Sequence, residues 1–507
     1  MKKDKLSDAV GMTGEKFLLE ALERREGKRR SAKKLWIAGI SLAAALALIV
    51  GAAFSPAMRL WGKRGEEGTG ENGNESESES APLPPETSVT LENPDFAVLA
   101  SPGKTVSEAY PGRAADFNGT AGEAWRAERE NEEALEEATV PLVRDFYKKL
   151  LSSELMTGGK GEDRAVAPTN LYLALGMLAE CAGGESREEL LALLGCGEIA
   201  EARERASSLR RATARDDGMK LSLPAASLWL QKGGSYDGAT LREIEKSYFA
   251  SAYAGELTGD EMEKAYADWV RENTLGILGE DAGKSPFTPD TVMALAATAL
   301  YQNEWGADFD PIGEAAFHTP EGESTAAFLT KTYDTWVYTG KGFTAAAAEL
   351  CEGDLVWFFL PDGGTNPEEL WASGEIVGLM TDPAVREKGE YAHLTLEFPE
   401  FTAASDLDLA ESLKGLGVNK IFSSSESDFS SLTDREGLVL TAARHASRVK
   451  ADARGIVAAA LTGLSVGGEG ATELREITLR LDRPFAFGIA GRCGALYFAG
   501  TVYDPAA

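Results

Sequence analysis

The feature that most constrains the fold of this chain is an uncharged, proline-free segment near its C-terminus, GIVAAALTGLSVGG at residues 455–468. Read with a period of two, one face carries only apolar or hydroxyl side chains, which suits a strand buried in a sheet. These residues are Ile456, Ala458, Ala460, Thr462, Leu464 and Val466. Read with a period of 3.6, the alanines favour a helix. The segment is therefore an ordinary core strand or helix, or else a strand that can change its place.

The stretches on both sides of this segment alternate as strands do. Upstream, residues 438–452 include His445, and downstream residues 483–489 and 494–502 form two strand-like runs. This order resembles the C-terminal region of serpins, in which a strand that bears a histidine leads to a small-residue hinge, an exposed bait loop and a strand that opens with Pro-Phe. The resemblance extends over residues 133–505.

Motifs elsewhere in the chain are similar to serpin motifs. They are Trp269-Val270 followed by Thr274, Trp305 before Phe309-Asp310-Pro311, Leu360-Pro361-Asp362, and the run Leu394 to Phe401. The resemblance implies an α+β fold with a large central, mostly antiparallel sheet, further sheets and about eight or nine helices. It assigns this domain to residues 131–507.

In serpins the small-residue segment stays outside the central sheet until the bait loop is cut, and then inserts as a strand. The resemblance implies a hinge at Gly455, Ile456, Val457, Ala458, Ala459, Ala460 and Thr462. Insertion would add about ten backbone hydrogen bonds at ~0.5–1.5 kcal/mol each, which rivals the ~5–15 kcal/mol stability of a whole domain. The function that the resemblance implies is suicide-substrate inhibition of serine or cysteine proteases, with no enzyme activity.

Two ways of counting place the bait bond that a protease would cut. Counted forward from Gly455 it is Glu469-Gly470, and counted back from Pro484 it is Glu473-Leu474. Both counts put a glutamate before the cut, which favours a glutamate-preferring protease. A cut elsewhere within residues 466–476 would suit elastase-like or trypsin-like proteases.

The hinge departs from the family pattern. Serpins commonly have an acidic pair before the glycine and a Thr or Ser after it, whereas Ala453 and Arg454 precede Gly455 here and Ile456 follows it. Isoleucine is bulky at this position, but it is uncharged and does not oppose burial as Lys or Glu would. The departure leaves open a non-inhibitory protein with a binding or chaperone-like role at the cell surface.

The resemblance also implies structural roles for four residues. It places His445 beside Asn170 and Thr298 beneath the part of the sheet that opens, and Trp305 near the top of the sheet, where the hinge enters. A lone histidine is more often structural than reactive. Ala167 stands where the family has a serine, so one hydroxyl of this polar cluster is missing.

Near the N-terminus, residues 35–58 carry no charge and are long enough to cross a bilayer as a helix. Residues 1–34 are rich in Lys and Arg, which stay in the cytoplasm under the positive-inside rule. We therefore expect a single-pass membrane anchor with the C-terminal domain outside the cytoplasm. The alternative is a signal peptide cleaved near the small residues at 52–57, which would give a secreted protein.

Between this segment and the domain lie two stretches of different character. Residues 59–90 are acidic with almost nothing to bury, and predict a disordered linker. Residues 91–130 contain scattered aromatic side chains without strong periodicity, and we assign no role to this extension. The aromatics are Phe96, Tyr110, Phe117 and Trp125.

Composition and spacing argue against other functions. The net charge of −30 repels nucleic acid. Gly463-Leu464-Ser465-Val466-Gly467 fits a hydrolase pattern, but the required histidine does not follow Ser465. The four cysteines show no paired short spacing, so we expect no metal and no cofactor. The expected partners are a serine or cysteine protease and, through residues 35–58, a membrane, with the protein itself a monomer.

Overall fold

The computed structural model describes residues 89–90, 96–111, 117, 119–278, 284–386, 388–456 and 474–506. Residues 87–507 form one compact unit. The segment at 35–58, hinge residues 457–462 and the bait-bond residues Glu469, Gly470 and Glu473 lie outside the described residues. Within the described ranges, no helix combines the length and the apolar character needed to cross a membrane.

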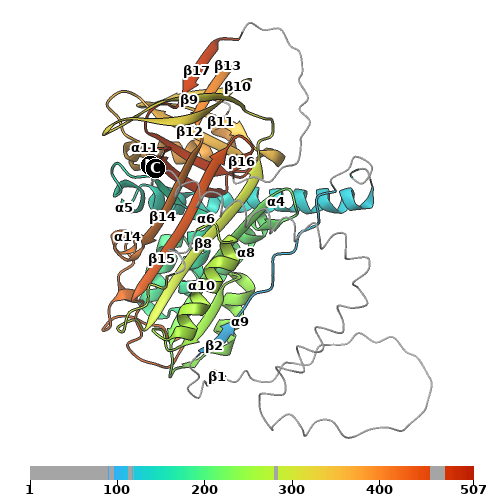
Figure 1. Cartoon of the computed structure of the whole chain (residues 1–507). Coiled ribbons are helices and arrows are strands. Elements are labelled where there is room, and N and C mark those ends of the chain that lie inside the picture. Colours follow the sequence, from blue (N-terminus) through green and yellow to red (C-terminus); the bar gives the residue numbers. More distant parts are fainter. Residues whose placement is uncertain are drawn as a thin grey trace, which may run out of the picture. The chain divides into compact units, whose positions relative to one another are not determined.

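An eight-stranded sheet forms the lower part of this unit in the view of Figure 1. Across the sheet its strands are β14 (Phe401–Asp408), β15 (Ala442–Asp452), β16 (Gly455–Ile456), β8 (Met293–Glu304), β5 (Leu221–Gln231), β7 (Ser251–Gly255) and β2 (Phe96–Ala100), with β4 (Arg215–Asp216) paired to β5. Among the described pairs of this sheet only β15–β8 and β5–β7 are parallel. The expected large, mostly antiparallel sheet is therefore confirmed.

A nine-stranded sheet and a small two-stranded ladder complete the β structure. The larger sheet contains β17 (Glu476–Arg480), β13 (Glu390–Pro399), β10 (Gly322–Gly340), β11 (Phe343–Glu349), β12 (Leu355–Pro361), β18 (Phe485–Ala490), β19 (Leu496–Val502) and β3 (Arg164–Val166), with β9 (Asp310–Thr319) paired to β10. In the ladder, β1 (Val89–Thr90) pairs with β6 (Ser235–Tyr236).

Helices cover both faces of the eight-stranded sheet. The helices of the described residues, of which α11 and α12 pack on the nine-stranded sheet instead, are α4 (Thr120–Leu151), α5 (Glu154–Thr157), α6 (Pro168–Cys181), α7 (Gly184–Leu194), α8 (Ile199–Thr213), α9 (Gly238–Ser247), α10 (Asp260–Thr274), α11 (Pro367–Ser373), α12 (Glu375–Thr381), α13 (Pro383–Arg386) and α14 (Ala410–Gly415). The α+β class is confirmed. The expected eight or nine helices were too few for the described residues, because very short helices such as α5 and α13 leave no periodic signal.

The core lies on both sides of the eight-stranded sheet. Every residue of α6 is buried, and its leucines belong to the main hydrophobic cluster together with inward side chains of β8 such as Leu295. On the opposite face, α10 packs Tyr266 and Trp269 against Trp229 of β5 and Ala294 of β8. Strand β8 is thus clamped between two helices, which explains its almost continuous burial.

Helix α4 begins at Thr120, well before Glu133, where the apolar periodicity starts. Its first half buries Trp125 and the carboxylates of Glu132 and Glu136. An apolar-period reading misses this half because polar contacts, and not an apolar stripe, bury it.

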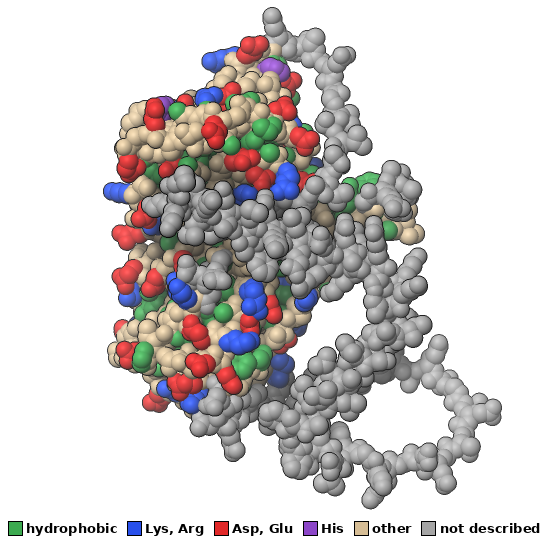
Figure 2. Space-filling view, in the orientation of Figure 1, with side chains coloured by type: hydrophobic (Ala, Val, Ile, Leu, Met, Phe, Trp, Pro, Cys, Tyr) green, Lys and Arg blue, Asp and Glu red, His purple; other side chains and the backbone are tan. Residues whose placement is uncertain are grey.

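Acidic and basic side chains are interspersed over the face seen in Figure 2. The described residues on this face therefore present no continuous basic surface of the kind that binds nucleic acid.

Candidate functional site

The site is the seam between β8 and β15. In its lower half the two strands pair directly and in parallel, Ala442–Ser447 against Ala294–Ala299. In its upper half the short strand β16 lies between them: Gly455 is opposite Glu304 of β8, and Ile456 is opposite Asn303. The seam is therefore closed at one end and already holds the first two residues of a new strand at the other.

A tight turn carries the chain from β15 back into the seam. Asp452 and Gly455 are register partners across the turn, and the Asp452 carboxylate accepts a hydrogen bond from Arg454 N at 2.9 Å. Gly455 has φ of 152°, and a Cβ there would lie 2.3 Å from Asn303 O. Glycine is thus required by the close approach of the two backbones.

Ile456 is only 1% exposed and belongs to the second hydrophobic cluster. The bulk that made this residue unusual for an inserting hinge is accommodated. Trp305, which is 4% exposed, lies at the same end of the seam: its backbone N donates to Arg454 O at 3.1 Å and its indole Nε1 donates to Asp452 O at 2.9 Å.

His445, Asn170 and Thr298 meet behind the closed half of the seam. Nε2 of the fully buried His445 accepts a hydrogen bond from Ala167 N at 3.0 Å, and Asn170 Nδ2 donates to Thr298 O at 2.9 Å. Burial lowers the pKa of His445 to about 4, so the imidazole is neutral at physiological pH. Trp305 lies at the other end of the seam, beside β16, and does not belong to this group.

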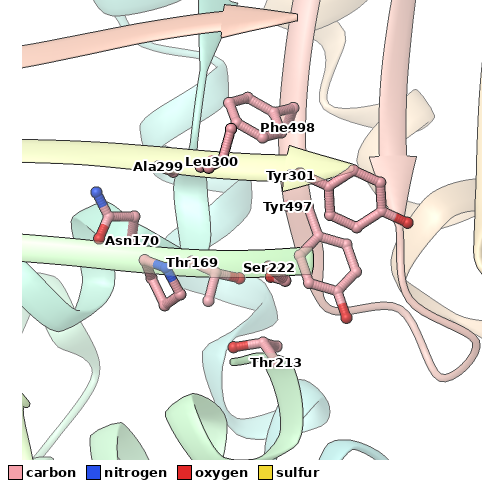
Figure 3. A pocket seen from close by; sticks show the side chains of 10 residues that line it. Thr169, Asn170, Thr213, Ser222, Ala299, Leu300, Tyr301, Tyr497 and Phe498 are labelled. Atoms are coloured by element: carbon pink, nitrogen blue, oxygen red, sulfur yellow. The ribbon is translucent and has the colours of Figure 1, made fainter. Parts of the chain in front are cut away.

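Three polar atoms of this group have no hydrogen-bond partner among the described residues: the Thr298 hydroxyl, the Asn170 side-chain oxygen and His445 Nδ1. A nearby cavity of about 10 Å³, lined in part by Asn170, Thr169 and Tyr301, has room for one water molecule (Figure 3). The cavity is too small for a drug-sized ligand.

A second buried polar group lies behind the end of the seam that holds β16, and no sequence pattern predicts it. The Tyr301 hydroxyl donates to Asp354 at 2.6 Å, and Lys220 Nζ is 2.5 Å from the same carboxylate and 2.8 Å from the Tyr497 hydroxyl. These contacts fix the ends of β5 and β8 to the nine-stranded sheet. Strand periodicity marks Tyr301 only as an inward side chain.

The far end of the predicted bait region is anchored in the other sheet. Strand β17 pairs in parallel with β13, and Arg475 O accepts a hydrogen bond from His393 N at 2.9 Å. The Arg475 guanidinium lies 3.1 Å from the Glu390 carboxylate. Of the four predicted bait-bond residues only Leu474 is described, and it lies next to this anchor, partly buried.

Metal ligation finds no support in the described part of the chain, where no group of three His, Cys, Asp or Glu side chains could hold an ion. Ser465 of the hydrolase-like pattern lies outside that part. What the seam shows is one short backbone strand, β16, that already pairs with β8 on one side and β15 on the other.

Comparison with known proteins agrees with this geometry. A family model described as Serpin (serine protease inhibitor) matches residues 141–505. Putative serpin-Z12 of Oryza sativa subsp. japonica is 25% identical over 430 residues, which cover 79% of this chain and 98% of the rice protein. Neuroserpin of Homo sapiens is 24% identical over 385 residues, covering 73% of this chain and 92% of neuroserpin.

Solved structures share the fold. The thermophilic serpin tengpin in its native state superposes with a TM-score of 0.63 at 19% identity, over 72% of this chain and 94% of tengpin. Human thyroxine-binding globulin superposes with a TM-score of 0.63 at 18% identity, over 74% of this chain and 100% of the globulin chain. With a family model that spans well over half of its length, this chain belongs to the serpin family, whose members are mostly protease inhibitors.

Proposed function

We propose that this protein is a suicide-substrate inhibitor of serine or cysteine proteases, and not itself an enzyme. The observation that carries the proposal is the register of β16, because Gly455 and Ile456 already pair with β8 on one side and β15 on the other. A strand that has begun to enter a seam can continue along it if the next side chains fit.

Continuing the register gives the fit of the inserted state. Ala458 would face Tyr301 and Val449, and Ala460 would face Ala299 and Ser447. Small side chains thus meet the inner face at each step. Thr462 would be level with His445. The period-two face of the segment matches the seam that lies before it.

The proposed reaction begins as ordinary proteolysis. The hydroxyl or thiol of the protease attacks the carbonyl carbon of Glu469, or of Glu473, and forms an acyl-enzyme. The peptide C–N bond breaks, and the released amine of Gly470 or Leu474 takes up a proton. Insertion of the freed strand then carries the attached protease away before water hydrolyses the ester or thioester.

Separating β8 from β15 breaks their direct pairing over Ala442–Ser447, and insertion replaces it with two new ladders. At ~0.5–1.5 kcal/mol net for each added hydrogen bond, the exchange favours the inserted form. The uncut protein is therefore metastable.

The test is incubation with glutamate-preferring, elastase-like and trypsin-like proteases, followed by denaturing electrophoresis. We expect a covalent complex with at least one protease, and mass spectrometry of the released C-terminal fragment gives the bait bond. Cleavage of the loop should also raise the melting temperature strongly. Clean cleavage without a complex by every protease, with no change in melting, would contradict the proposal.

A non-inhibitory binding or chaperone-like protein is the second candidate. Arg454 just before Gly455, in place of the acidic residue common in serpins, is the observation that favours it. It predicts cleavage without covalent trapping.

We further propose that residues 35–58 anchor the protein in a membrane, with residues 87–507 outside the cytoplasm. The uncharged stretch after a basic segment supports this orientation. Retention in the membrane fraction after alkaline extraction, and digestion by protease added outside intact cells, test it. Release of a shortened soluble protein would instead support the secreted alternative.

A further inference from the structure

The extension at residues 91–130 precedes the part of the chain that the family model matches, yet its strand β2 belongs to the eight-stranded sheet. Strand β2 pairs antiparallel with β7 and becomes the outermost strand of this sheet. The Phe96 ring stacks on Tyr253 of β7, with ring centroids 6.0 Å apart. Strand β2 is therefore attached to the β8–β5–β7 half of the sheet.

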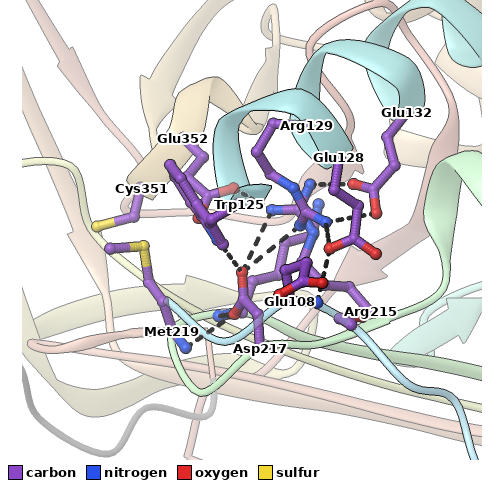
Figure 4. A network of polar contacts seen from close by, with 12 residues as sticks. Glu108, Trp125, Glu128, Arg129, Glu132, Arg215, Asp217, Met219, Cys351 and Glu352 are labelled. Carbon is purple, nitrogen blue, oxygen red and sulfur yellow. Dashed lines mark hydrogen bonds and ion pairs between the residues drawn. The ribbon is translucent and has the colours of Figure 1, made fainter. Parts of the chain in front are cut away.

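The other three aromatic side chains of the extension form a single group. Trp125 near the start of α4 is 7% exposed, and its ring lies 5.3 Å from that of Tyr110 and 5.9 Å from that of Phe117. The indole Nε1 donates a hydrogen bond to Asp217 Oδ2 at 3.1 Å (Figure 4). Residues that have no periodicity in the sequence are thus brought together around one carboxylate.

Asp217 lies in the turn between β4 and β5, and its side chain is 0% exposed. One carboxylate oxygen, Oδ1, accepts from Met219 N at 2.9 Å and from Lys220 N at 2.8 Å, which fixes the turn. The other oxygen faces α4, where the Arg129 guanidinium lies 3.5 Å away beside Trp125. The backbone carbonyl oxygen of Asp217 accepts a hydrogen bond from Tyr110 N at 2.9 Å.

Arg215 of β4 adds a second link to the same helix, because it forms ion pairs with Glu132 of α4 and with Glu352. Both contacts are buried, where an ion pair broken on one side leaves an uncompensated charge. The turn between β4 and β5 is thus tied to α4 at two neighbouring points.

Helix α4 is held in turn by the part of the molecule that carries β15. The Glu136 carboxylate accepts hydrogen bonds from Cys493 N at 3.1 Å and Ala495 N at 2.8 Å, in the turn between β18 and β19. Strand β19 pairs with β3, and Ala165 O of β3 accepts from the Ser447 hydroxyl of β15 at 2.6 Å. A chain of contacts therefore runs from α4 to the far side of the seam.

We propose that Tyr110, Trp125, Arg129 and Asp217 form a clasp that holds the two sides of the seam together and slows its opening. The inference rests on the proposed function, because it concerns the same strand insertion. A new strand needs about 4.8 Å of additional spacing between β8 and β15. A shift of that size, transmitted through β5 to the β4–β5 turn, would break the hydrogen bond between Trp125 and Asp217.

The clasp explains how a metastable serpin domain keeps its loop outside the sheet until a protease cuts it. The clasp raises the free-energy barrier to insertion of the loop and does not change the stability of the strand once it has inserted. Loss of the clasp should therefore speed spontaneous insertion of the uncut loop.

The test compares Trp125→Phe, which keeps an aromatic ring but removes the donor, with Trp371→Phe as a matched control. Trp371 is fully buried in α11, and its Nε1 has no partner among the described residues. Purified full-length proteins are incubated below their melting temperature. Aliquots are then treated with a glutamate-specific endoprotease and with elastase, because a loop inserted uncut resists both. We expect Trp125→Phe to become resistant about tenfold faster than the wild type, the factor that ~1.4 kcal/mol of barrier gives, with Trp371→Phe unchanged.

A second variant guards against misfolding of the first. Arg129→Gln removes the ion pair between α4 and the Asp217 carboxylate at a side chain that is 12% exposed, and should also accelerate resistance. Equal rates for both variants and the wild type would overturn the clasp, provided that cutting the wild-type loop raises its melting temperature. If cutting leaves the wild-type melting temperature unchanged, strand insertion does not occur, and the proposed function falls together with the clasp.

Discussion

The indole of Trp305 donates a hydrogen bond to the backbone carbonyl of Asp452 at 2.9 Å, and so pins the turn that feeds the hinge into the sheet. Both groups are buried, which makes the bond costly to lose. The bond therefore holds the seam open at the end where the predicted hinge enters. It joins two residues that are 147 positions apart in the sequence.

Replacing this tryptophan tests the anchor. Trp305→Phe leaves the Asp452 carbonyl without its buried donor, and we expect the free energy of unfolding to fall by about 1–3 kcal/mol. Urea denaturation measures the change. Trp357→Phe is the control, since Trp357 is 1% exposed and its Nε1 has no partner among the described residues. A loss no larger than in the control would show that the bond does not stabilise the turn.

Register predicts a sharp difference between two neighbouring hinge positions. Continued along β15, Ala460 would face inward beside Ser447, whereas Ala459 would face outward beside the exposed Arg448. We expect Ala460→Glu to reduce covalent complex with the target protease at least about tenfold, because an unpaired carboxylate would be buried. Ala459→Glu should retain inhibition. Electrophoresis of the complexes measures both variants, and equal effects would refute this register.

The pKa of His445 predicts acid sensitivity with a defined sign. Burial lowers this pKa from 6.5 to about 4, so the folded protein binds a proton only at a lower pH than the unfolded chain does. The stability from the neutral imidazole is complete above pH 6.5 and is lost as pH falls through 4, at up to about 1.4 kcal/mol per pH unit. The expected difference from His445→Gln is about 3 kcal/mol over this window, measured by urea denaturation. Parallel pH profiles for the two proteins would contradict it.

Glu136 predicts the opposite trend. Burial, the largest cause, raises its pKa from 4.5 to about 7, with Asp354 also raising it, while Lys220 and the backbone donors Ala495 and Cys493 lower it. As the pH falls, the folded protein therefore binds this proton at a higher pH than the unfolded chain does. The charged carboxylate costs stability above pH 7, and the cost disappears as pH falls toward 4.5.

Glu136→Gln keeps an acceptor for the two backbone donors and removes the charge. As the pH rises from 4.5 to above 7, we expect the free energy of unfolding of the variant to increase by about 3 kcal/mol relative to that of the wild type. Urea titrations at both ends of the window measure the gain. A constant difference across the window would show that the wild-type carboxyl does not titrate there.

Several elements were predictable because their physical signal is local. Period-two alternation predicted strands at residues 483–489 and 494–502, and both exist, as β18 and β19. Each signal arises from side chains that face a common core within one element.

Other parts of the site depend on contacts between distant residues. Phe96, Tyr110, Phe117 and Trp125 follow no period because they pack against Tyr253 and around Asp217, which lie elsewhere in the chain. For the same reason the early start of α4 escaped prediction.

The sequence by itself determined that a small-residue ribbon near the C-terminus can fit a sheet, because the alternation of side-chain size is a property of adjacent residues. Only the tertiary structure decided where that ribbon begins to enter, between β8 and β15, and what restrains it. The restraint depends on a buried carboxylate, Asp217, and an indole, Trp125, that are 92 residues apart and meet only after the sheet has formed.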